Sequence, residues 1–550
     1  MSGLSTPPEE NNSRRNFIIG LIGLFTLPIA GWLYYRSRKN SPSTLGENIP
    51  VRIAGQSHSS GHLLRDQSIQ QQMPVELTKK VVIVGAGIAG LTAARSLTKA
   101  GIDDLLILEH ESNSGGNSSS RSNRLGSYPL GAHYLPIPDI SYAPLKEFLE
   151  ANKIIQGYNA QGVPLYNEEY LCFAPDERLY IHGLWQDGLV PQIGNSAETN
   201  QEIKRFLKKM DEFREAKSVT DNKFAFAIPV ASSSKDPIYT TYDSYSMKEF
   251  MQREGYKSEE LLWYVDYCCR DDYGTNISDT SAWAGIHYFA ARRGVAANAE
   301  RGDVLTWPQG NHFLVSCLEK EVKAEQRTGC LVYKINQDHN SCSVDFLDLQ
   351  EKKLYRVHCE KIILATPQFI NARLINNPER KTDLFSYAPW MVANMVVQAR
   401  EEDKGAPLSW DNVIYKSPSL GYVNSSHQTL QQKHEHLIYT YYYAFSDMAP
   451  AEARKKMLAM STDEWKELIL KDLKRPHKQI AERIDNIEVW MWGHAMVRPV
   501  PGFITSEQRA AAARPIGRVH FAHSDLSGLS IFEEAFHQGI RAAEEIIHSI

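Results

Sequence analysis

Apolar and polar positions near residue 80 follow the order strand, helix, strand. Residues 80–84 are one lysine followed by an apolar run, of the length expected for a buried parallel strand, and residues 91–100 repeat their apolar positions with helical spacing. Residues 104–108 are one aspartate followed by a second apolar run. Glycines stand between the first strand and the helix. This order predicts a βαβ unit, in which two parallel strands are joined by a crossover helix.

The pattern along the rest of the chain predicts a mixed α/β protein. Alternation over residues 170–190 predicts a hairpin or meander with turns at Asp176-Glu177 and Asp187-Gly188. Ser246 and Glu249 have the spacing of a capping box, which predicts that a helix begins there. Further helices are predicted over residues 142–151, 202–217 and 533–543, and further strands over residues 331–335, 342–346, 361–367, 385–450 and 517–522.

The densest mixture of aromatic and charged residues lies over residues 263–273. One interpretation is that this stretch lines a substrate pocket, with Asp271 or Asp272 facing a cationic group. The other, which the sequence favours slightly, is the end of an amphipathic helix whose acids are solvated.

The N-terminal 40 residues have a different pattern. Residues 17–35 are an almost continuous apolar run, and a helix of that length spans roughly 28 Å, about one hydrocarbon core. Residues 13–18, Ser-Arg-Arg-Asn-Phe-Ile, resemble the twin-arginine export motif of bacteria. We expect an uncleaved membrane anchor with the rest of the chain in the bacterial periplasm. The basic residues after the run favour the alternative, a plain anchor with a cytoplasmic body.

Composition is that of an ordinary globular protein. The chain has 550 residues, 42% hydrophobic and 23% charged, with a net charge of −5, and is long enough for two or more cores. The mild acidity argues against a nucleic-acid surface. The seven cysteines show no CxxC and no metal-ligand spacing, so no metal site is expected, and the neighbours Cys268 and Cys269 are interpreted as buried small hydrophobes.

The glycines after the first strand have the spacing of a dinucleotide-binding turn. In this GxGxxG pattern Gly85 makes the tight turn, Gly87 lets the backbone approach a pyrophosphate, and Gly90 lets helix and strand pack closely. The pyrophosphate is then expected on the helix N-terminus, at Ile88 and Ala89, where unpaired N–H groups favour an anion.

The residues after the second strand indicate which dinucleotide is bound. Glu109 is placed to accept hydrogen bonds from a ribose. Residues 115–117, Gly-Gly-Asn, resemble the second diglycine of the flavin amine oxidase and phytoene desaturase superfamily of oxidoreductases. Residues 131–134, Gly-Ala-His-Tyr, resemble the turn that those enzymes lay beside the flavin ring. The resemblance covers about residues 79–550 and implies that the cofactor is FAD.

The C-terminal half carries further elements of this resemblance. Residues 361–367 resemble the strand and Ala-Thr-Pro turn that close back on the dinucleotide, and Asp525 is the implied contact to the ribityl or pyrophosphate portion. Residues 533–543 resemble the last helix of these enzymes, whose positive N-terminus is expected to stabilise the reduced flavin. The implied cofactor residues are Gly85, Gly87, Ile88, Ala89, Gly90, Glu109, Gly116, Asn117, Gly131, Ala132, Val332, Ala365, Asp525 and Ala535.

The resemblance implies an α/β (α+β, two-domain) fold in which a Rossmann-like FAD domain is interleaved with a substrate domain. The expected order is an export signal or anchor over residues 1–40, a linker or arm over 41–78, the FAD domain over 79–150, 301–380 and 491–550, and the substrate domain over 151–300 and 381–490.

Four residues are candidates for the substrate side of the flavin. Amine oxidases of this superfamily place a lysine near flavin N5, and the best placement puts Asn394 there, which makes a dehydrogenase or a slow oxidase plausible. Trp492 and Phe532 are candidates for an aromatic pair that sandwiches an amine, with a core role as the alternative. His133 either bonds the ring or the substrate, or has a structural role.

Three hypotheses for function follow. The first is an FAD-dependent oxidoreductase of amine oxidase type that oxidises an amine, polyamines included, by hydride transfer to flavin N5, with oxygen or a quinone or redox protein as electron acceptor. The second is an FAD-dependent desaturase or isomerase of an apolar, carotenoid-like substrate, which acids at the pocket would undermine. The third is a flavin-binding assembly protein without catalysis.

Overall fold

A computed structural model of the protein describes residues 48–66, 73–338, 341–375, 377, 380–400, 404–429 and 434–549. Residues 50–550 form one compact unit, and all elements named below belong to it. The predicted export motif and anchor lie outside the described residues. Within the described ranges, no helix combines the length and the apolar character needed to cross a membrane.

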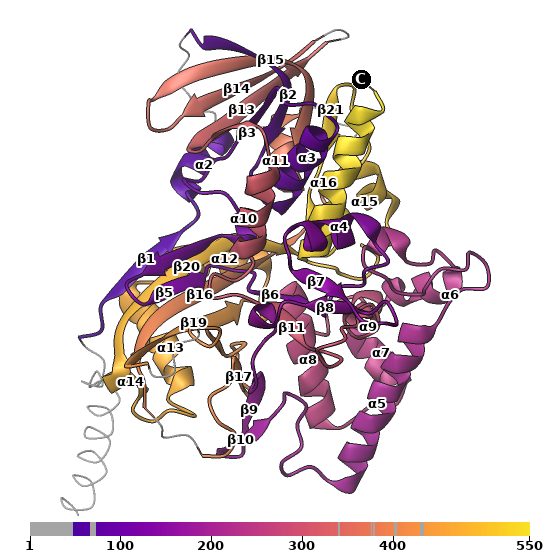
Figure 1. The fold of residues 1–550 in the computed structure, drawn as a ribbon. Coiled ribbons are helices and arrows are strands. Elements are labelled where there is room, and N and C mark those ends of the chain that lie inside the picture. Colours follow the sequence, from indigo (N-terminus) through magenta and orange to yellow (C-terminus); the bar gives the residue numbers. More distant parts are fainter. Residues whose placement is uncertain are drawn as a thin grey trace, which may run out of the picture. The chain divides into compact units, whose positions relative to one another are not determined.

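A mainly parallel sheet is built around the βαβ unit (Figure 1). β2 (Val75–Val84) lies at its centre, and its neighbours β3 (Leu105–Leu108) and β15 (Lys353–Leu364) both run parallel to it. Residues 81–84 and 105–108 are all buried, because parallel strands are covered on both faces. β12 (Glu325–Arg327) and β21 (Val519–Phe521) extend the sheet in parallel, and β14 (Cys342–Asp348) and β13 (Cys330–Gln337) extend it in antiparallel order.

A second, mainly antiparallel sheet has eight strands in the described part of the chain. Their order is β1 (Val51–Gly55), β20 (Ile484–Val497), β16 (Tyr387–Gln398), β19 (His436–Ala444), β18 (Tyr422–Asn424), β17 (Asp411–Ile414), β9 (Glu177–Ile181) and β10 (Leu184–Asp187). β16 is buried at every position except its last, so both of its faces are covered. β9 and β17 run parallel, which sets Glu177 level with Asp411.

Most helices cover these two sheets or pack with one another. α5 (Ala197–Glu215), α7 (Met247–Arg253) and α8 (Glu259–Tyr273) all contact α9 (Ala282–Ala290), and Figure 1 shows them as one group. The remaining elements are α2 (His58–Asp66), α4 (Ala143–Ala151), α6 (Pro237–Thr240), α10 (His312–Glu321), α11 (Gln368–Leu374), α12 (Pro450–Ala459), α13 (Thr462–Leu473), α14 (Ile480–Arg483), α15 (Glu507–Ala512), and the paired strands β4 (Ser120–Asn123) with β5 (Gly126–Pro129), β6 (Tyr134–Pro136) with β11 (Val304–Thr306), and β7 (Ile155–Tyr158) with β8 (Pro164–Tyr166).

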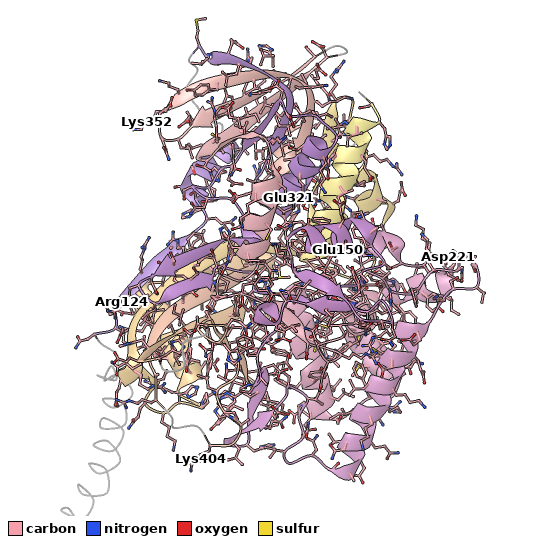
Figure 2. All side chains as sticks on the ribbon, viewed as in Figure 1. Arg124, Glu150, Asp221, Glu321, Lys352 and Lys404 are labelled. Atoms are coloured by element: carbon pink, nitrogen blue, oxygen red, sulfur yellow. The ribbon has the colours of Figure 1, made fainter. Side chains whose placement is uncertain are left out.

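The helix of the βαβ unit, α3 (Ile88–Lys99), is fixed by its neighbours on several sides. α16 (Phe532–Ile547) lies against it (Figure 1), and a Cβ atom on Gly539 of α16 would lie 2.4 Å from the Ala89 carbonyl oxygen. Arg95 of α3 donates to Glu321 of α10 (2.7 Å), which is labelled in Figure 2, and Glu321 also accepts from Asn152 (2.8 Å). The N-terminus of α3 is therefore held by rigid elements.

The sequence pattern predicts most elements correctly. The βαβ unit, the capping box of Ser246 and Glu249, and the strands within residues 385–450 are confirmed. The hairpin is present as β9 and β10, but the turns predicted at Asp176-Glu177 and Asp187-Gly188 are wrong, because Glu177 and Asp187 are strand residues. The chain turns at His182-Gly183, where both residues have positive φ.

The predicted domain boundaries remain predictions. β1 and α2 lie in the stretch interpreted as a linker or arm, and β1 pairs with β20 of the second sheet. β20 itself runs across the boundary predicted at residue 490. The two sheets nevertheless draw their strands alternately from the N-terminal, middle and C-terminal parts of the chain, in agreement with an interleaved α/β fold.

Candidate active site

The turn between β2 and α3 requires glycine at two of its three positions for packing. Gly85 has φ +102°, and a Cβ atom there would lie 2.8 Å from the Ala365 carbonyl oxygen. A Cβ atom on Gly90 would lie 2.0 Å from the Gly85 carbonyl oxygen, which is well inside van der Waals contact. The turn, the start of α3 and the end of β15 thus pack backbone against backbone.

Gly87 differs from the other two glycines because it faces open space. Its backbone is extended (φ −77°, ψ −179°), and nothing lies within 4 Å of the position of a Cβ atom. It is the N-cap residue of α3, and among the described residues no side chain caps this helix. The first-turn N–H groups, those of Ile88 and Ala89 included, therefore remain available to an anion, which fits the predicted pyrophosphate.

Glu109 and the second diglycine support this turn. The largely buried Glu109 carboxylate accepts hydrogen bonds from the N–H groups of Ala86 (2.7 Å) and Glu111 (2.9 Å), and burial raises its pKa. A Cβ atom on Gly116 would lie 3.6 Å from the Cα atom of Gly87. The ribose contact stays a prediction, for which the carboxylate keeps unused lone pairs.

The turn predicted to lie beside the flavin ring packs on the second diglycine. A Cβ atom on Gly131 would lie 2.4 Å from the Asn117 carbonyl oxygen, and the Ala132 N–H donates to that same oxygen (2.9 Å). The Asn117 side chain in turn donates to the Ala495 carbonyl of β20. Two segments that the sequence assigns to the cofactor are therefore in direct contact.

Two further predicted cofactor residues belong to the first sheet or directly follow one of its strands. The Ala365 N–H donates to the Val84 carbonyl (2.8 Å), so Ala365 continues β15 alongside the glycine turn. Val332 is a buried residue of β13, a strand that reaches the end of β3 through the hydrogen bond from Cys330 N–H to the Glu109 carbonyl (2.8 Å). Their contacts to the cofactor stay predictions.

Asp525 is completely buried and hydrogen-bonded to protein groups. Its carboxylate accepts from the N–H of Gln368 (2.9 Å) and the hydroxyl of Tyr387 (2.6 Å), and His523 Nδ1 lies 3.1 Å from it. Burial acts to raise its pKa, but His523 and these hydrogen bonds shift the pKa downward overall. In this structure Asp525 joins the segment after β21 to α11, and its predicted contact to FAD remains a prediction.

The start of α16 carries two buried acids. Ala535, a predicted cofactor residue, lies one turn in, after Glu533 and Glu534, and burial raises the pKa of each glutamate to about 7. Glu534 accepts a hydrogen bond from the Val230 N–H (2.6 Å). Carboxyl groups in the first turn offset the positive end of a helix when ionised. The stabilisation of the reduced flavin by this helix end therefore stays a prediction, which these acids oppose only when they are ionised.

Three side chains from the second sheet hold the turn over residues 129–134. Asn394 of β16 donates to the Pro129 carbonyl (3.3 Å), Trp492 of β20 donates to the Leu130 carbonyl (2.5 Å), and Tyr442 of β19 donates to the Gly131 carbonyl (3.0 Å). The three acceptors are the backbone carbonyl groups of three consecutive residues. The second sheet thus fixes the position of the turn that is predicted to face the flavin.

Asn394 is buried, and its amide oxygen accepts a hydrogen bond from the Thr440 hydroxyl (2.7 Å). With its amide nitrogen bonded to the Pro129 carbonyl, both ends of the side chain are bound by protein. The structure therefore shows Asn394 as an anchor of the turn, while its predicted role of holding a water at the flavin remains a prediction.

The proposed aromatic pair is not formed. Phe532 packs with Phe148 and Phe536 (ring centroids 6.3 and 5.8 Å apart), in the core of the first sheet. Trp492 belongs to the other hydrophobic cluster and neighbours Trp490 (5.9 Å). The predicted pairing of Trp492 with Phe532 is therefore corrected. Each of the two packs in a separate hydrophobic core, and a core role was the alternative interpretation for both.

A different aromatic group surrounds His133. Its ring stacks on Tyr442 (centroids 4.6 Å apart) and lies 5.5 Å from Trp410, which in turn meets Tyr134 edge-on (5.9 Å). Burial lowers the pKa of His133 to about 4, so the ring is neutral at pH 7. His133 and Trp410 also line a small pocket with Gln428.

Three carboxylates lie next to this aromatic group. Asp271 accepts from the Tyr134 hydroxyl (3.3 Å), and Asp411, the neighbour of Trp410 in sequence, accepts from the Tyr267 hydroxyl (3.4 Å). Glu177 is the register partner of Asp411 on the parallel strand. We call Glu177, Asp271 and Asp411 the acidic cluster.

The acids at the end of α8 are not the solvated groups that the sequence slightly favoured. Asp272 is buried and forms a salt bridge with Arg292 (2.6 Å), and Asp271 belongs to the acidic cluster. The prediction of solvated acids at the end of this helix is therefore wrong, and the pocket interpretation fits better. Cys268 and Cys269 are both buried, as predicted.

The pKa values of the three carboxyl groups in the acidic cluster are all raised. Burial and the neighbouring negative charges raise the pKa of Glu177 and of Asp271 to about 7, and burial together with Glu177 and Asp271 raises the pKa of Asp411 strongly. In the described part of the chain no salt bridge reaches these three groups, since Arg292 is paired with Asp272. Excess negative charge of this kind is suited to a cationic ligand.

Sequence reasoning missed Glu177, Asp411, Tyr442 and Arg292 as site residues. Glu177 was assigned to a turn, and Asp411 carries no local signal. The one available hint was the aromatic run around Tyr442, which was assigned to the substrate domain and not to the flavin-side turn.

The comparisons with known proteins agree with this geometry. The model of the family described as flavin containing amine oxidoreductase matches residues 88–547.

Solved structures with the same fold include several enzymes. Putrescine oxidase bound to putrescine is 16% identical with a TM-score of 0.60, covering 86% of this chain and 100% of that chain. Cyclohexylamine oxidase from Brevibacterium oxydans is 16% identical with a TM-score of 0.60, covering 86% of this chain and 99% of its own. A fatty acid isomerase from P. acnes that produces CLA is 15% identical with a TM-score of 0.60, covering 85% and 98%. At these identities the likeness shows the fold.

Proposed function

This chain belongs to the flavin containing amine oxidoreductase family, and we propose that the substrate it oxidises with FAD is a cationic amine, with diamines and polyamines as the preferred class. The observation that carries the proposal is the acidic cluster beside the aromatic group of His133, Trp410 and Tyr442. Carboxylates and aromatic faces are the two kinds of protein surface that attract an alkylammonium group.

The residues of the site indicate which steps FAD would perform and which the protein would perform. FAD, when bound, supplies the redox chemistry by accepting a hydride equivalent from the carbon next to nitrogen. The glycine turn and the N-terminus of α3 would hold its pyrophosphate, and the turn over residues 129–134 would lie beside its ring. Asp271 and Glu177 bind the ammonium group when ionised, and a carboxylate whose pKa is about 7 also accepts a proton from it.

A desaturase or isomerase acting on an apolar substrate is the alternative, and the fold is shared with the fatty acid isomerase. The acidic cluster counts against it, since an apolar chain would leave these half-buried carboxyl groups without a cationic partner. A non-catalytic flavin protein is the remaining alternative.

Anaerobic reduction of the bound flavin tests the proposal. We expect diamines or polyamines to bleach the flavin absorbance of the purified protein, while apolar polyenes and unsaturated fatty acids leave it unchanged. Bleaching by the apolar compounds alone would overturn the proposal in favour of the desaturase. No bleaching by either class would favour the non-catalytic alternative. The rate at which the flavin absorbance recovers in air then separates an oxidase from a dehydrogenase. The asparagine at position 394 favours a dehydrogenase.

The acidic cluster predicts a pH dependence. Because the pKa of Glu177 and of Asp271 is about 7, these two acids are mainly ionised above pH 7 and mainly protonated below it. We expect kcat/KM for a diamine to fall by roughly tenfold between pH 8 and pH 6, since kcat/KM reports groups of the free enzyme. The apparent pKa belongs to the coupled cluster. A flat profile over this range, at constant flavin content, would contradict the assignment.

We propose further that the enzyme is exported and tethered at the periplasmic face of the inner membrane. The support is the twin-arginine motif at Arg14 and Arg15 and the apolar run over residues 17–35. A flavoprotein that acquires FAD in the cytoplasm suits an export route that carries folded proteins.

A further inference from the structure

Two cysteines face each other across adjacent strands of the first sheet. Cys342 of β14 and Cys359 of β15 are register partners, and their sulfur atoms lie 3.5 Å apart. Both side chains are buried. No other pair of the seven cysteines, all of which lie in the described part of the chain, makes a sulfur–sulfur contact of this kind.

We propose that Cys342 and Cys359 are a redox site, which closes to a cross-strand disulfide when the protein meets a disulfide oxidant. Residues directly opposite each other on antiparallel strands have Cα atoms about 4.5 to 5.5 Å apart, and this separation lies within the range that a disulfide spans. Closure therefore needs rotation of two side chains and no movement of the strands.

The surroundings make Cys342 the attacking sulfur. The hydrogen bond with Cys359 and the positive charges of Arg518 and Lys361 lower the pKa of Cys342 despite burial, which favours its thiolate. The pKa of Cys359 is raised by the same pairing and by burial. A thiolate next to a neutral thiol is the arrangement from which exchange begins.

The reaction balances through two exchange steps. The Cys342 thiolate attacks one sulfur of glutathione disulfide, which forms a mixed disulfide and releases one glutathione thiolate. Cys359 loses its proton and attacks the Cys342 sulfur, which forms the Cys342–Cys359 bond and releases the second glutathione. Counted from the dithiol, whose Cys342 proton is lost when the thiolate forms, the protein loses two electrons and two protons, and glutathione disulfide gains them as two glutathione thiols. In an exported protein, a disulfide oxidoreductase outside the cytoplasm supplies the same chemistry.

Closure acts on the cofactor sheet and leaves the acidic cluster untouched. β15 continues from Cys359 to Ala365, whose carbonyl packs against Gly85 of the dinucleotide turn. The bond would tie this strand to β14 and restrict the unfolded chain, which stabilises the folded state. The inference does not depend on the identity of the substrate.

Thiol counting on the FAD-loaded, full-length protein tests the proposal. One sample is reduced with dithiothreitol and another is treated with glutathione disulfide, and each is then denatured and titrated with Ellman's reagent. We expect the oxidised sample to show two fewer thiols than the reduced one, and peptide mapping to find residues 342 and 359 in one linked pair. A second oxidation with the small oxidant diamide covers slow access to the buried sulfurs. Seven thiols after both treatments, or a bond between other cysteines, would overturn the proposal.

Matched serine variants make the test specific. Cys342→Ser and Cys359→Ser are expected to show the same thiol count before and after oxidation. Cys269→Ser, which removes a cysteine buried in α8, is expected to lose two thiols on oxidation like the parent protein. Oxidation is also expected to raise the urea midpoint of the parent and of Cys269→Ser, with no change for Cys342→Ser. Loss of thiols from Cys342→Ser would refute the assignment of the pair.

Discussion

Replacing Gly87 with glutamate is expected to give a folded protein that has lost its FAD. The backbone of Gly87 has φ −77° and ψ −179°, which any residue adopts, and the position of its Cβ atom is open, so the new side chain meets no protein atom there. Its carboxylate would occupy the N-terminus of α3, where the pyrophosphate is expected, and would compete with it for the same N–H groups. Purified Gly87→Glu should therefore be colourless, with a flavin to protein ratio near zero.

Two further variants separate loss of the cofactor from loss of the fold. Gly157→Glu places the same side chain at another glycine with open space, in β7, and should retain FAD. Gly90→Ala should fail for a different reason, because its Cβ atom would lie 2.0 Å from the Gly85 carbonyl oxygen and must disrupt the packing of α3 on β2. Circular dichroism should show native content for Gly87→Glu. Stoichiometric FAD in Gly87→Glu would contradict the cofactor site.

The cofactor side of the molecule is predictable from sequence because its signals are local. The glycines at 85, 87 and 90 stand between a strand and a helix that immediate neighbours determine, and their three roles follow from spacing alone. The structure adds the physical reason, which is that Gly85 and Gly90 are needed by the protein itself whereas Gly87 faces open space. The strand that leads to Ala365, far along the chain, was also predicted correctly, because it is a short apolar run followed by a turn.

The substrate side is much less predictable, because its residues are brought together by pairing between distant segments. Nothing near Glu177 or Asp411 in the sequence shows that their strands are parallel neighbours in one register. Asp271 was noticed, but burial decides its role, and a helical pattern alone favoured solvent. Phe532 is a different case: it was a candidate for an aromatic pair around an amine, and it packs in the core with Phe148, which was the alternative role.

Neutralising the acidic cluster is expected to impair the oxidation of diamines more than any other change at the substrate side. Glu177→Gln, Asp271→Asn and Asp411→Asn each remove one carboxylate and keep the side-chain volume. A hydrogen bond to a charged group contributes about 1.5 to 3 kcal/mol, so kcat/KM should fall by roughly 10-fold to 100-fold for each variant. Asp463→Asn, which changes an exposed acid of α13, is the matched control and should leave kcat/KM unchanged.

The pH profile of these variants distinguishes a binding role from a purely structural one. Glu177 and Asp411 are level on neighbouring strands, and the charge of Glu177 raises the pKa of Asp411. Removing this charge in Glu177→Gln should therefore lower the pKa of Asp411, and the midpoint of the kcat/KM profile should move to lower pH. A structural defect would reduce kcat/KM equally at every pH and leave the midpoint in place. The direction of that movement thus tests whether these three half-buried carboxylates act as one charged site, which is the property that makes the pocket suited to a substrate with more than one ammonium group.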